Sequence, residues 1–263
     1  MGGNYFNYEE LERELGNRVP ERAIHYYAET SSTNTIAREL AQAGAPEGTL
    51  VLADRQTGGQ GRLSRRWISP AGGGLWFTLV LRPLMEPGEA AQITLLAAVA
   101  TAKAIELNTG ICPGIKWPND LLINGRKVCG IIAEMEGGED IAHIILGIGI
   151  NVNMGMRDFG LDLQGIATSL EIELGRSVCR LTLLDEVLGQ FDYWYSLWQR
   201  EGFEPIRVAW KQYTITLKQN VKVDCGDEIW FGEAMDIGDD GALLIRTTDG
   251  LVKSFNFGEV SIR

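Results

Sequence analysis

The chain has 263 residues, of which 45% are hydrophobic and 22% are charged. This size and balance are typical of a globular protein and exclude a disordered chain. With 35 acidic and 24 basic residues, the net charge of −11 opposes nonspecific attraction to nucleic acid or to anionic membranes. Local clusters of positive charge are therefore informative.

The sequence carries no evident signal for export or membrane insertion. Residues 5–22 combine frequent charges with no apolar core, unlike a signal peptide. The longest apolar run, 93–102, ends at Lys103, well short of the roughly 20 residues that a spanning helix requires. We therefore expect a cytoplasmic protein that does not enter a membrane. The four cysteines, Cys112, Cys129, Cys179 and Cys225, form no C-x-x-C pair, so the sequence does not support a zinc site. We expect reduced thiols, as in a cytoplasmic protein.

The first half of the chain predicts a short helix, two strands and a long helix. The capping residues Ser31-Ser32-Thr33-Asn34 precede the short helix, and Gly44 follows it as a stop. Alanine and leucine dominate the long helix, which is expected to be mostly buried. In chain order the four ranges are 35–43, 49–53, 75–81 and 88–107.

The second half predicts strands and helices, followed by a change of texture near residue 216. Asn124 and Gly125 stand between two apolar runs, a strong hairpin signal that places Lys127 just past a tight turn. Short alternating strands separated by Asp-Gly turns predict a small β domain over 216–263, beside a large domain over 1–215. The other strands are expected over 121–123, 128–135 and 141–152, and the helices over 185–200 and 204–213.

The loop over 58–67 places glycines, arginines and a tryptophan side by side. Glycine lets the backbone approach a ligand closely, arginine offers several donors to a carboxylate or phosphate, and Trp67 offers a stacking face. The segment 116–127 adds further cations and a carboxylate. Together the two segments predict a site for an anionic ligand such as a nucleotide. The charged residues concerned are Arg62, Arg65, Arg66, Lys116, Asp120 and Lys127.

Each of these groups also has a purely structural interpretation: solvated arginines, ordinary surface lysines and a turn aspartate. Motifs of other enzyme classes are missing. The sequence has no G-x-x-x-x-G-K-[ST] phosphate loop, and Gly147-Ile148-Gly149 lacks the third glycine of a dinucleotide fingerprint. His25 and His143 stand beside no Ser or Cys elbow, so a catalytic triad has no support. The cations taken together favour a phosphate-binding site that works without an enzyme nucleophile.

Several ordered motifs resemble the biotin protein ligase family, also called biotin–[acetyl-CoA-carboxylase] ligase, over nearly the whole chain. They are Ser32-Thr33-Asn34, Gln56 with Gly59-Gln60-Gly61-Arg62, Trp67-Ile68-Ser69-Pro70, Lys116-Trp117-Pro118-Asn119-Asp120, Gly125 to Ile131, Gly147 to Asn153, and Ala167-Thr168-Ser169-Leu170. The resemblance implies an α+β fold. Its catalytic domain over 1–215 has the mixed sheet of biotin/lipoate ligases, similar to class II synthetases, with a connector-like segment 1–22. A small SH3-like β-barrel over 216–263 follows.

The resemblance also implies a reaction in two steps. Biotin and ATP, with Mg²⁺ arriving on the ATP, give biotinyl-5′-AMP, and a lysine of a biotin carboxyl carrier protein or domain then attacks the mixed anhydride. Cations offset the repulsion between the biotin carboxylate and the triphosphate, and neither step needs an enzyme nucleophile. A homodimer is a further expectation from the family.

The family pattern assigns roles to residues of this chain. Lys127, Arg62 and Asp120 are the candidate catalytic residues, with Asp120 orienting Lys127 or helping to accept the proton of the incoming lysine. The implied biotin-binding set is Ser32, Thr33, Gln56, Gly59, Gln60, Arg62, Lys127 and Gly130. The implied ATP- and adenylate-binding set is Arg62, Arg65, Trp67, Lys116, Asn119, Lys127 and Asn151. No protein ligand to a metal is implied.

One departure and two alternatives accompany this interpretation. Many family members carry Gly-Arg-Gly-Arg where this chain has Gln60, and a lost charge-assisted bond would weaken biotin binding by about 1 kcal/mol. Lipoate–protein ligase has related chemistry and a similar domain, so it is the alternative among enzymes. A biotin-sensing repressor is the other alternative. About 30 residues precede Ser32, too few for a helix-turn-helix and its supporting helices, so we expect the form without one and no nucleic acid as partner.

Overall fold

A computed structural model describes residues 11, 13, 22–137 and 141–262. The expected connector-like segment 1–22 lies outside the described residues except at Leu11, Arg13 and Arg22. The chain divides into two compact units, which are described separately below. The first comprises Met1–Leu84 and Ile123–Glu186, and the second comprises Met85–Leu122 and Val187–Arg263.

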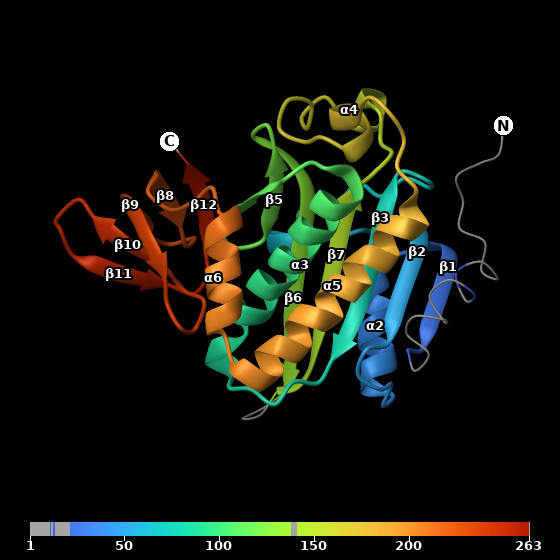
Figure 1. The fold of residues 1–263 in the computed structure, drawn as a ribbon, viewed down its shortest axis with the longest axis horizontal. Coiled ribbons are helices and arrows are strands. Elements are labelled where there is room, and N and C mark those ends of the chain that lie inside the picture. The colour runs from blue at the N-terminus through green and yellow to red at the C-terminus, as the bar shows by residue number, and fades with distance from the viewer. Residues whose placement is uncertain (1–10, 12, 14–21, 138–140, 263) are drawn as a thin grey trace. The chain divides into compact units, whose positions relative to one another are not determined.

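The first unit is built on five neighbouring strands of a mixed sheet, in the order β1-β2-β3-β7-β6 (Figure 1). β1 and β2 are parallel, whereas β2–β3, β3–β7 and β7–β6 are antiparallel. The expected mixed sheet is therefore confirmed. The parallel edge strand β1 was not predicted. The bounds are β1 Ile24–Thr30, β2 Leu50–Gln56, β3 Gly74–Leu81, β6 Arg126–Gly137 and β7 Ile141–Asn151.

Helix α2 (Thr33–Gln42) packs against β2, β3 and β7 of this unit. Its buried residues Ala37 and Ala41 join Val51, Val80 and Ile145 in one apolar cluster, because small side chains allow the helix to approach the sheet closely. The helix begins two residues before the expected start at residue 35. Ser32 of the expected capping run occupies the N-cap position, and its side chain makes no capping hydrogen bond.

A short helix, α4 (Leu170–Leu174), was not predicted from the sequence. It begins where the Ser169 hydroxyl accepts a hydrogen bond from the Ile172 amide at 3.1 Å, and it ends at Gly175 with φ of 68°. These are a side-chain N-cap and a left-handed glycine stop. Both signals are present in the sequence, but the helix between them is too short to show an apolar period.

The second unit contains α3 (Ala91–Thr109), α6 (Glu204–Tyr213) and most of α5 (Arg180–Glu201). α3 and α6 pack against each other, and both contact β4 (Gly114–Lys116). With the 3-10 turn before it, Pro87–Thr109 is long and apolar enough to cross a membrane, unlike the shorter run expected from the sequence. Its most apolar window is 67% buried inside the protein, which is the burial of a core helix.

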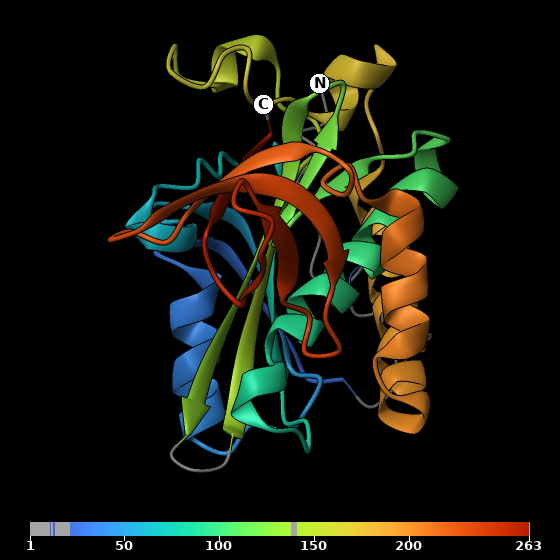
Figure 2. The same cartoon turned by 90° about the vertical axis from the view of Figure 1, so that its left-hand side faces the viewer.

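The last strands form a five-stranded antiparallel sheet, in the order β11-β10-β9-β8-β12. Figure 2 shows these orange and red strands curving around one another. The expected small β domain is therefore confirmed as an antiparallel sheet, consistent with an SH3-like domain. Its boundary at residue 216 stays a prediction. The bounds are β8 Asn220–Asp224, β9 Ile229–Ile237, β10 Leu243–Thr247, β11 Val252–Phe255 and β12 Glu259–Ile262.

Candidate active site

The indole of Trp67 packs against the sheet of the first unit at a point where two glycines leave the backbone without side chains. Gly130 of β6 is paired with Gly149 of β7. A Cβ built at Gly149 would come within 2.6 Å of the Trp67 Nε1 atom, and one at Gly130 within 3.0 Å of the same ring. The two glycines therefore make the room in which the ring lies. Trp76 of β3 meets Trp67 edge-on, with ring centroids 6.4 Å apart.

The Trp67 indole also carries a polar group without a protein partner. Its Nε1 atom is buried and has no hydrogen-bond acceptor among the described residues. An orphaned buried donor costs free energy of about 1–3 kcal/mol, which an acceptor on a ligand would recover. The position of Trp67 therefore suits a ligand with acceptor atoms as well as a flat ring.

The loop that carries Trp67 folds back on itself like a hairpin. The Trp67 amide donates to the Gly59 carbonyl at 2.9 Å, and the Gly61 amide donates to the Arg65 carbonyl at 2.7 Å. At its tip Leu63 has φ of 55° and is 69% exposed. Gly59 is needed because a Cβ there would come within 2.7 Å of the Trp67 carbonyl oxygen. The loop joins β2 to β3, as the sequence predicted.

A chain of neutral polar groups lies beside Gly59. The Gln56 side-chain carbonyl accepts hydrogen bonds from the Thr33 amide at 2.8 Å and from the Thr33 hydroxyl at 3.1 Å. The Gln56 amide nitrogen donates to the Ser69 hydroxyl at 3.0 Å. Thr78 of β3 donates to Thr33 at 2.8 Å. The structure thus brings together Thr33 and Gln56, two residues predicted to bind biotin. Ser32, directly before Thr33 in the chain, is buried.

Helix α2 is held in place by charged groups on β6. Arg38 pairs with Glu134 at 3.0 Å and with Glu136 at 2.6 Å. The Gln42 side chain donates to Glu136 at 3.0 Å. This hydrogen bond, together with Arg38 and His143, holds the pKa of Glu136 below its ordinary value despite partial desolvation. These contacts fix the helix whose first turn supplies Thr33.

Lys127 lies at the start of β6, directly after a tight turn. Asn124 and Gly125 have φ of 51° and 74°, the left-handed conformations that a type I′ turn requires. The predicted turn and the position of Lys127 are therefore confirmed. The Lys127 amide donates to the Ile166 carbonyl at 2.8 Å, and the Lys127 carbonyl accepts from the Thr168 amide at 2.9 Å. A Cβ built at Gly130 would lie 3.2 Å from the Lys127 ammonium nitrogen.

Asn151, at the end of β7, is buried in the first unit. Its amide nitrogen donates to the Thr168 carbonyl at 3.0 Å, so the side chain has a fixed direction. The Ser169 hydroxyl donates to the Met154 carbonyl at 2.6 Å. The Ala167-Thr168-Ser169 motif therefore tethers both Asn151 and the backbone of Lys127.

Gln60, Arg62 and Arg65 lie in the loop of the first unit that carries Trp67, whereas Lys116, Asn119 and Asp120 belong to the second unit. Lys116 of β4 and Asp120 of β5 (Asp120–Ile123) form an ion pair with 3.6 Å between the charged atoms. Asn119, which lies between them in the sequence, is buried. The Trp117 amide donates to the Thr216 hydroxyl at 2.9 Å, and its indole donates to the Gly241 carbonyl at 3.2 Å. Thr216 and Gly241, which both follow α6 in the chain, therefore hold the segment that carries Lys116 and Asp120.

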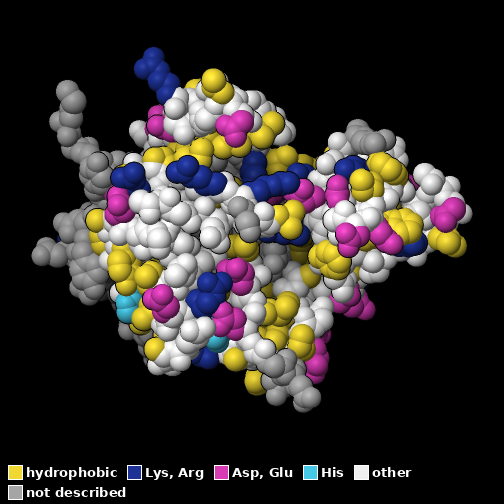
Figure 3. Space-filling view, turned by 180° about the vertical axis from the view of Figure 1, so that it is seen from behind, with side chains coloured by type: hydrophobic (Ala, Val, Ile, Leu, Met, Phe, Trp, Pro, Cys, Tyr) yellow, Lys and Arg dark blue, Asp and Glu magenta, His cyan; other side chains and the backbone are white. Residues whose placement is uncertain are grey.

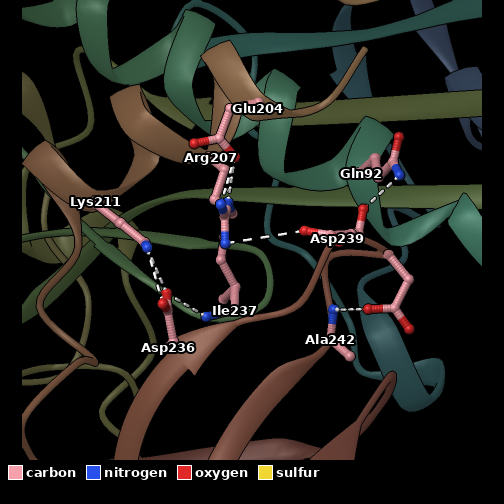
Figure 4. A network of polar contacts seen from close by, with 9 residues as sticks. Gln92, Glu204, Arg207, Lys211, Asp236, Ile237, Asp239 and Ala242 are labelled. Carbon is pink, nitrogen blue, oxygen red and sulfur yellow. Dashed lines mark hydrogen bonds and ion pairs between the residues drawn. The ribbon is translucent and has the colours of Figure 1, made fainter.

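Figure 4 shows a polar network that fastens the small sheet to the helices of the second unit. The Gln92 side chain of α3 donates to the Asp239 carbonyl at 2.8 Å and accepts from the Trp198 indole at 2.7 Å. Lys211 of α6 pairs with Asp236 at 2.7 Å. Residues on both sides of Gly241, which accepts the hydrogen bond from the Trp117 indole, are thus held by contacts from α3 and α6.

Figure 3 shows dark blue Lys and Arg side chains on the face drawn, although the net charge of the chain is −11. Among the described residues, no group of three or more His, Cys, Asp and Glu side chains could hold a metal ion. The four cysteines, all of them among the described residues, form no disulfide.

Two polar residues of the first unit were not identified from the sequence. Thr78 lies within an apolar strand, where an isolated threonine gives no signal. Glu173 lies on the short helix α4, and its only signal is the Ser169 cap before it. Their partners become evident only once the strands and the loops are folded.

Two family models match the chain. The model described as "Biotin/lipoate A/B protein ligase family" matches residues 26–151, and the model described as "Biotin protein ligase C terminal domain" matches residues 216–263. The fold and the site therefore define a ligase of the biotin/lipoate class.

Similar proteins narrow this class. The "Bifunctional ligase/repressor BirA" of Bacillus subtilis is 42% identical over 92% of this chain and 75% of its own. A "Biotin--[acetyl-CoA-carboxylase] ligase" of Paracoccus denitrificans is 37% identical over 85% of this chain and 94% of its own. A biotin protein ligase from Aquifex aeolicus, solved in complex with biotin and ATP, has a TM-score of 0.78 at 30% identity, covering 92% of this chain and 98% of its own. This chain belongs to the biotin protein ligase family and is an enzyme with biotin protein ligase activity.

Proposed function

We propose that the enzyme joins biotin to ATP, forming biotinyl-5′-AMP, and then transfers biotin to a lysine of a biotin carboxyl carrier protein or domain. The acceptor belongs to acetyl-CoA carboxylase or a related carboxylase. One observation carries the proposal: a cation, an indole with an orphaned N–H and a chain of neutral polar groups gather around Gly59, Gly130 and Gly149. A molecule with a neutral head, a carboxylate and a nucleotide fits this combination.

The neutral groups suit the ureido ring of biotin. Thr33 and Gln56, with Ser32 beside them, offer donors and acceptors whose directions are fixed by hydrogen bonds. Such fixed groups recognise an uncharged polar ring in an otherwise apolar site. Gly59, Gln60 and the backbone of Gly130 complete this part of the proposed site.

The cations suit the carboxylate and the phosphate. We assign Lys127 to the biotin carboxylate and the α-phosphate, where it stabilises charge in the transition state. Arg62 and Arg65 of the loop hold phosphates and enclose the adenylate, since a reactive anhydride must be kept from water. Asp120 is assigned to orienting Lys127 or helping to accept the proton of the incoming lysine. Adenosine-binding roles are assigned to Trp67, Lys116, Asn119 and Asn151.

The chemistry requires two anions to meet, so positive charge has to come from the protein and from the ion bound to ATP. We propose that Mg²⁺ arrives with ATP, because this ion is usually held by substrate phosphates and one or two carboxylates. The attack of the biotin carboxylate on the α-phosphorus and the later attack of a lysine amine proceed on bound substrates. The enzyme supplies positioning and charge, and no nucleophile of its own is required.

Three further proposals concern the whole protein. The catalytic domain covers 1–215 and the small SH3-like domain 216–263, which agrees with the span of the second family model. The protein works in the cytoplasm, in keeping with cysteines that form no disulfide. It forms a homodimer, as the resemblance to the family implies.

The decisive experiment is the ATP-dependent transfer of biotin to an isolated carrier domain, followed by intact-protein mass. We expect a single added biotin on the wild-type carrier and none when its acceptor lysine is replaced by arginine. A parallel reaction with lipoic acid distinguishes the other ligase of this class. Modification by lipoate alone would overturn the proposal.

A further inference from the structure

We propose that Glu173 is a positioning residue for the adenylation step, acting through Lys127. This inference rests on the function proposed above for Lys127. Glu173 lies on α4, the short helix labelled in Figure 1, and its side chain is only 5% exposed. A carboxylate so deeply buried is costly unless donors surround it.

Three donors meet this carboxylate. Arg126 donates to it at 2.7 Å, Thr168 at 2.6 Å and Asn124 at 2.8 Å. Arg126 and Thr168 share one carboxylate oxygen, and Asn124 takes the other. Charge-assisted hydrogen bonds of this kind are roughly twice as strong as neutral ones.

The three donors come from the two segments that fix Lys127. Asn124 and Arg126 belong to the turn directly before it, and Thr168 belongs to the segment hydrogen-bonded to its backbone. The Lys127 amide and carbonyl are bonded to Ile166 and Thr168 on either side. Glu173 therefore ties together both sides of the Lys127 backbone.

Charge gives the carboxylate a second effect. Arg126 and Lys127 are neighbouring cations, and Glu173 takes Arg126 as its partner at 2.7 Å. The Lys127 ammonium lies instead near the Trp67 ring, 5.3 Å from its centroid. Glu173 thus binds Arg126, and the Lys127 ammonium lies beside Gly130 in the glycine-lined part of the site, where an adenylate phosphate would be held.

The test compares Glu173→Gln with Glu171→Gln, which makes the same change of charge on the same helix. We expect Glu173→Gln to lower kcat of biotin-dependent ATP–pyrophosphate exchange at least about tenfold, because a misplaced catalytic cation costs that much or more. The KM for biotin should stay within about threefold, because the ureido contacts are untouched. Glu171→Gln should match the wild type. Thr168→Val removes one donor and should reproduce part of the kcat loss.

A double-mutant cycle shows whether Glu173 acts through Lys127. The observable is the affinity for a non-hydrolysable biotinyl-adenylate analogue, which is measurable in inactive variants. Glu173→Gln should weaken binding in the wild type by no more than Lys127→Ala does, and should have no further effect once Lys127 is alanine. Equal effects in both backgrounds would show that Glu173 acts elsewhere and would overturn the inference.

Hydrogen exchange provides a readout that does not depend on activity. The Lys127 and Thr168 amides should lose protection in Glu173→Gln while the melting temperature stays within a few degrees of that of Glu171→Gln. Unchanged protection would refute the positioning role, whatever the rates. Absence of biotin-dependent exchange in the wild type would instead refute the proposed function, so the two failures are separable.

Discussion

The Lys127 ammonium faces the indole of Trp67, with 5.3 Å between the nitrogen and the ring centroid. The lysine comes from the start of β6, whereas the tryptophan comes from the loop between β2 and β3. A cation near an indole gains roughly 0.5–2 kcal/mol, depending on its exposure to water. The two residues therefore hold the loop against the sheet by an interaction that an anionic ligand would compete for.

Lys127→Ala should abolish adenylation while leaving the fold intact. The side chain supplies positive charge where it develops in the transition state, so we expect biotin-dependent ATP–pyrophosphate exchange to fall by about 100-fold or more. Lys103→Ala removes an exposed lysine paired with Glu106 and serves as control. Near-normal exchange in Lys127→Ala would contradict the assigned role.

Gly149→Ala should displace the Trp67 ring from its position against the sheet. The added Cβ would lie 2.6 Å from the indole nitrogen, so the ring has to move or the protein loses about 1–3 kcal/mol to overpacking. Gly189→Ala is the matched control, because its Cβ meets open space on α5. It should stabilise the protein by roughly 0.5–1 kcal/mol. Chemical denaturation measures both, and equal shifts in the two variants would show that Gly149 is not needed to make room for the ring.

Gln92→Leu should destabilise the second unit. The replacement leaves the buried Trp198 indole N–H without its acceptor, which costs about 1–3 kcal/mol. Gln42→Leu removes an exposed hydrogen bond to Glu136 and should change the free energy of unfolding by less than about 0.5 kcal/mol. Denaturant titration of both variants is the measurement. A Gln92→Leu effect as small as that of the control would mean that water replaces the lost acceptor.

Tyr213 should resist ionisation at high pH. Burial, followed by its hydrogen bond to Glu106 at 2.6 Å and the charge of Glu106, raises the pKa of the phenol. A raised pKa stabilises the fold fully below the ordinary tyrosine value of about 10, and this contribution is lost as the pH rises through the folded value. Ultraviolet titration should show one late tyrosine that is missing in Tyr213→Phe. Unchanged titration curves in that variant would contradict the prediction.

The pKa of Glu106 sets the lower end of the pH range in which the Tyr213–Glu106 hydrogen bond stabilises the fold. The hydrogen bond from Tyr213 is the main cause that lowers the pKa of Glu106, and Lys103 adds to it. A lowered carboxyl pKa stabilises the fold above the unfolded value near 4.3 and ceases to do so as the pH falls through the folded value. The stability difference between wild type and Tyr213→Phe should therefore be largest between about pH 5 and 9.

The elements with strong local signals were predictable from the sequence. Asn124-Gly125 specified its turn because both positions need left-handed backbone, which few other residue pairs tolerate. The long helix α3 was evident from its alanine and leucine content. β1 was missed because Ile24–Thr30 mixes apolar, aromatic and charged residues without alternation, and its place is set by parallel pairing to β2.

Contacts between distant segments were not predictable in the same way. The hydrogen bonds of Gln56 to Thr33 and Ser69 depend on the folded loop, and the motifs indicated only that these residues belong together. The pairing of Lys116 with Asp120 follows from two short neighbouring strands, whereas the role of Asp120 toward Lys127 stays a prediction. Sequence patterns identified the residues, whereas tertiary folding determined their partners.

The hydrogen bond from the Trp117 indole to the Gly241 carbonyl bears on attempts to divide this enzyme. A fragment ending at residue 215 would keep the Lys116–Asp120 motif but lose both Gly241 and Thr216, the acceptors of the two Trp117 donors. Two halves cut there should therefore be inactive when separate and recover activity when tethered together. A cut after residue 215 would thus make biotin transfer to the carrier depend on the two fragments being held together.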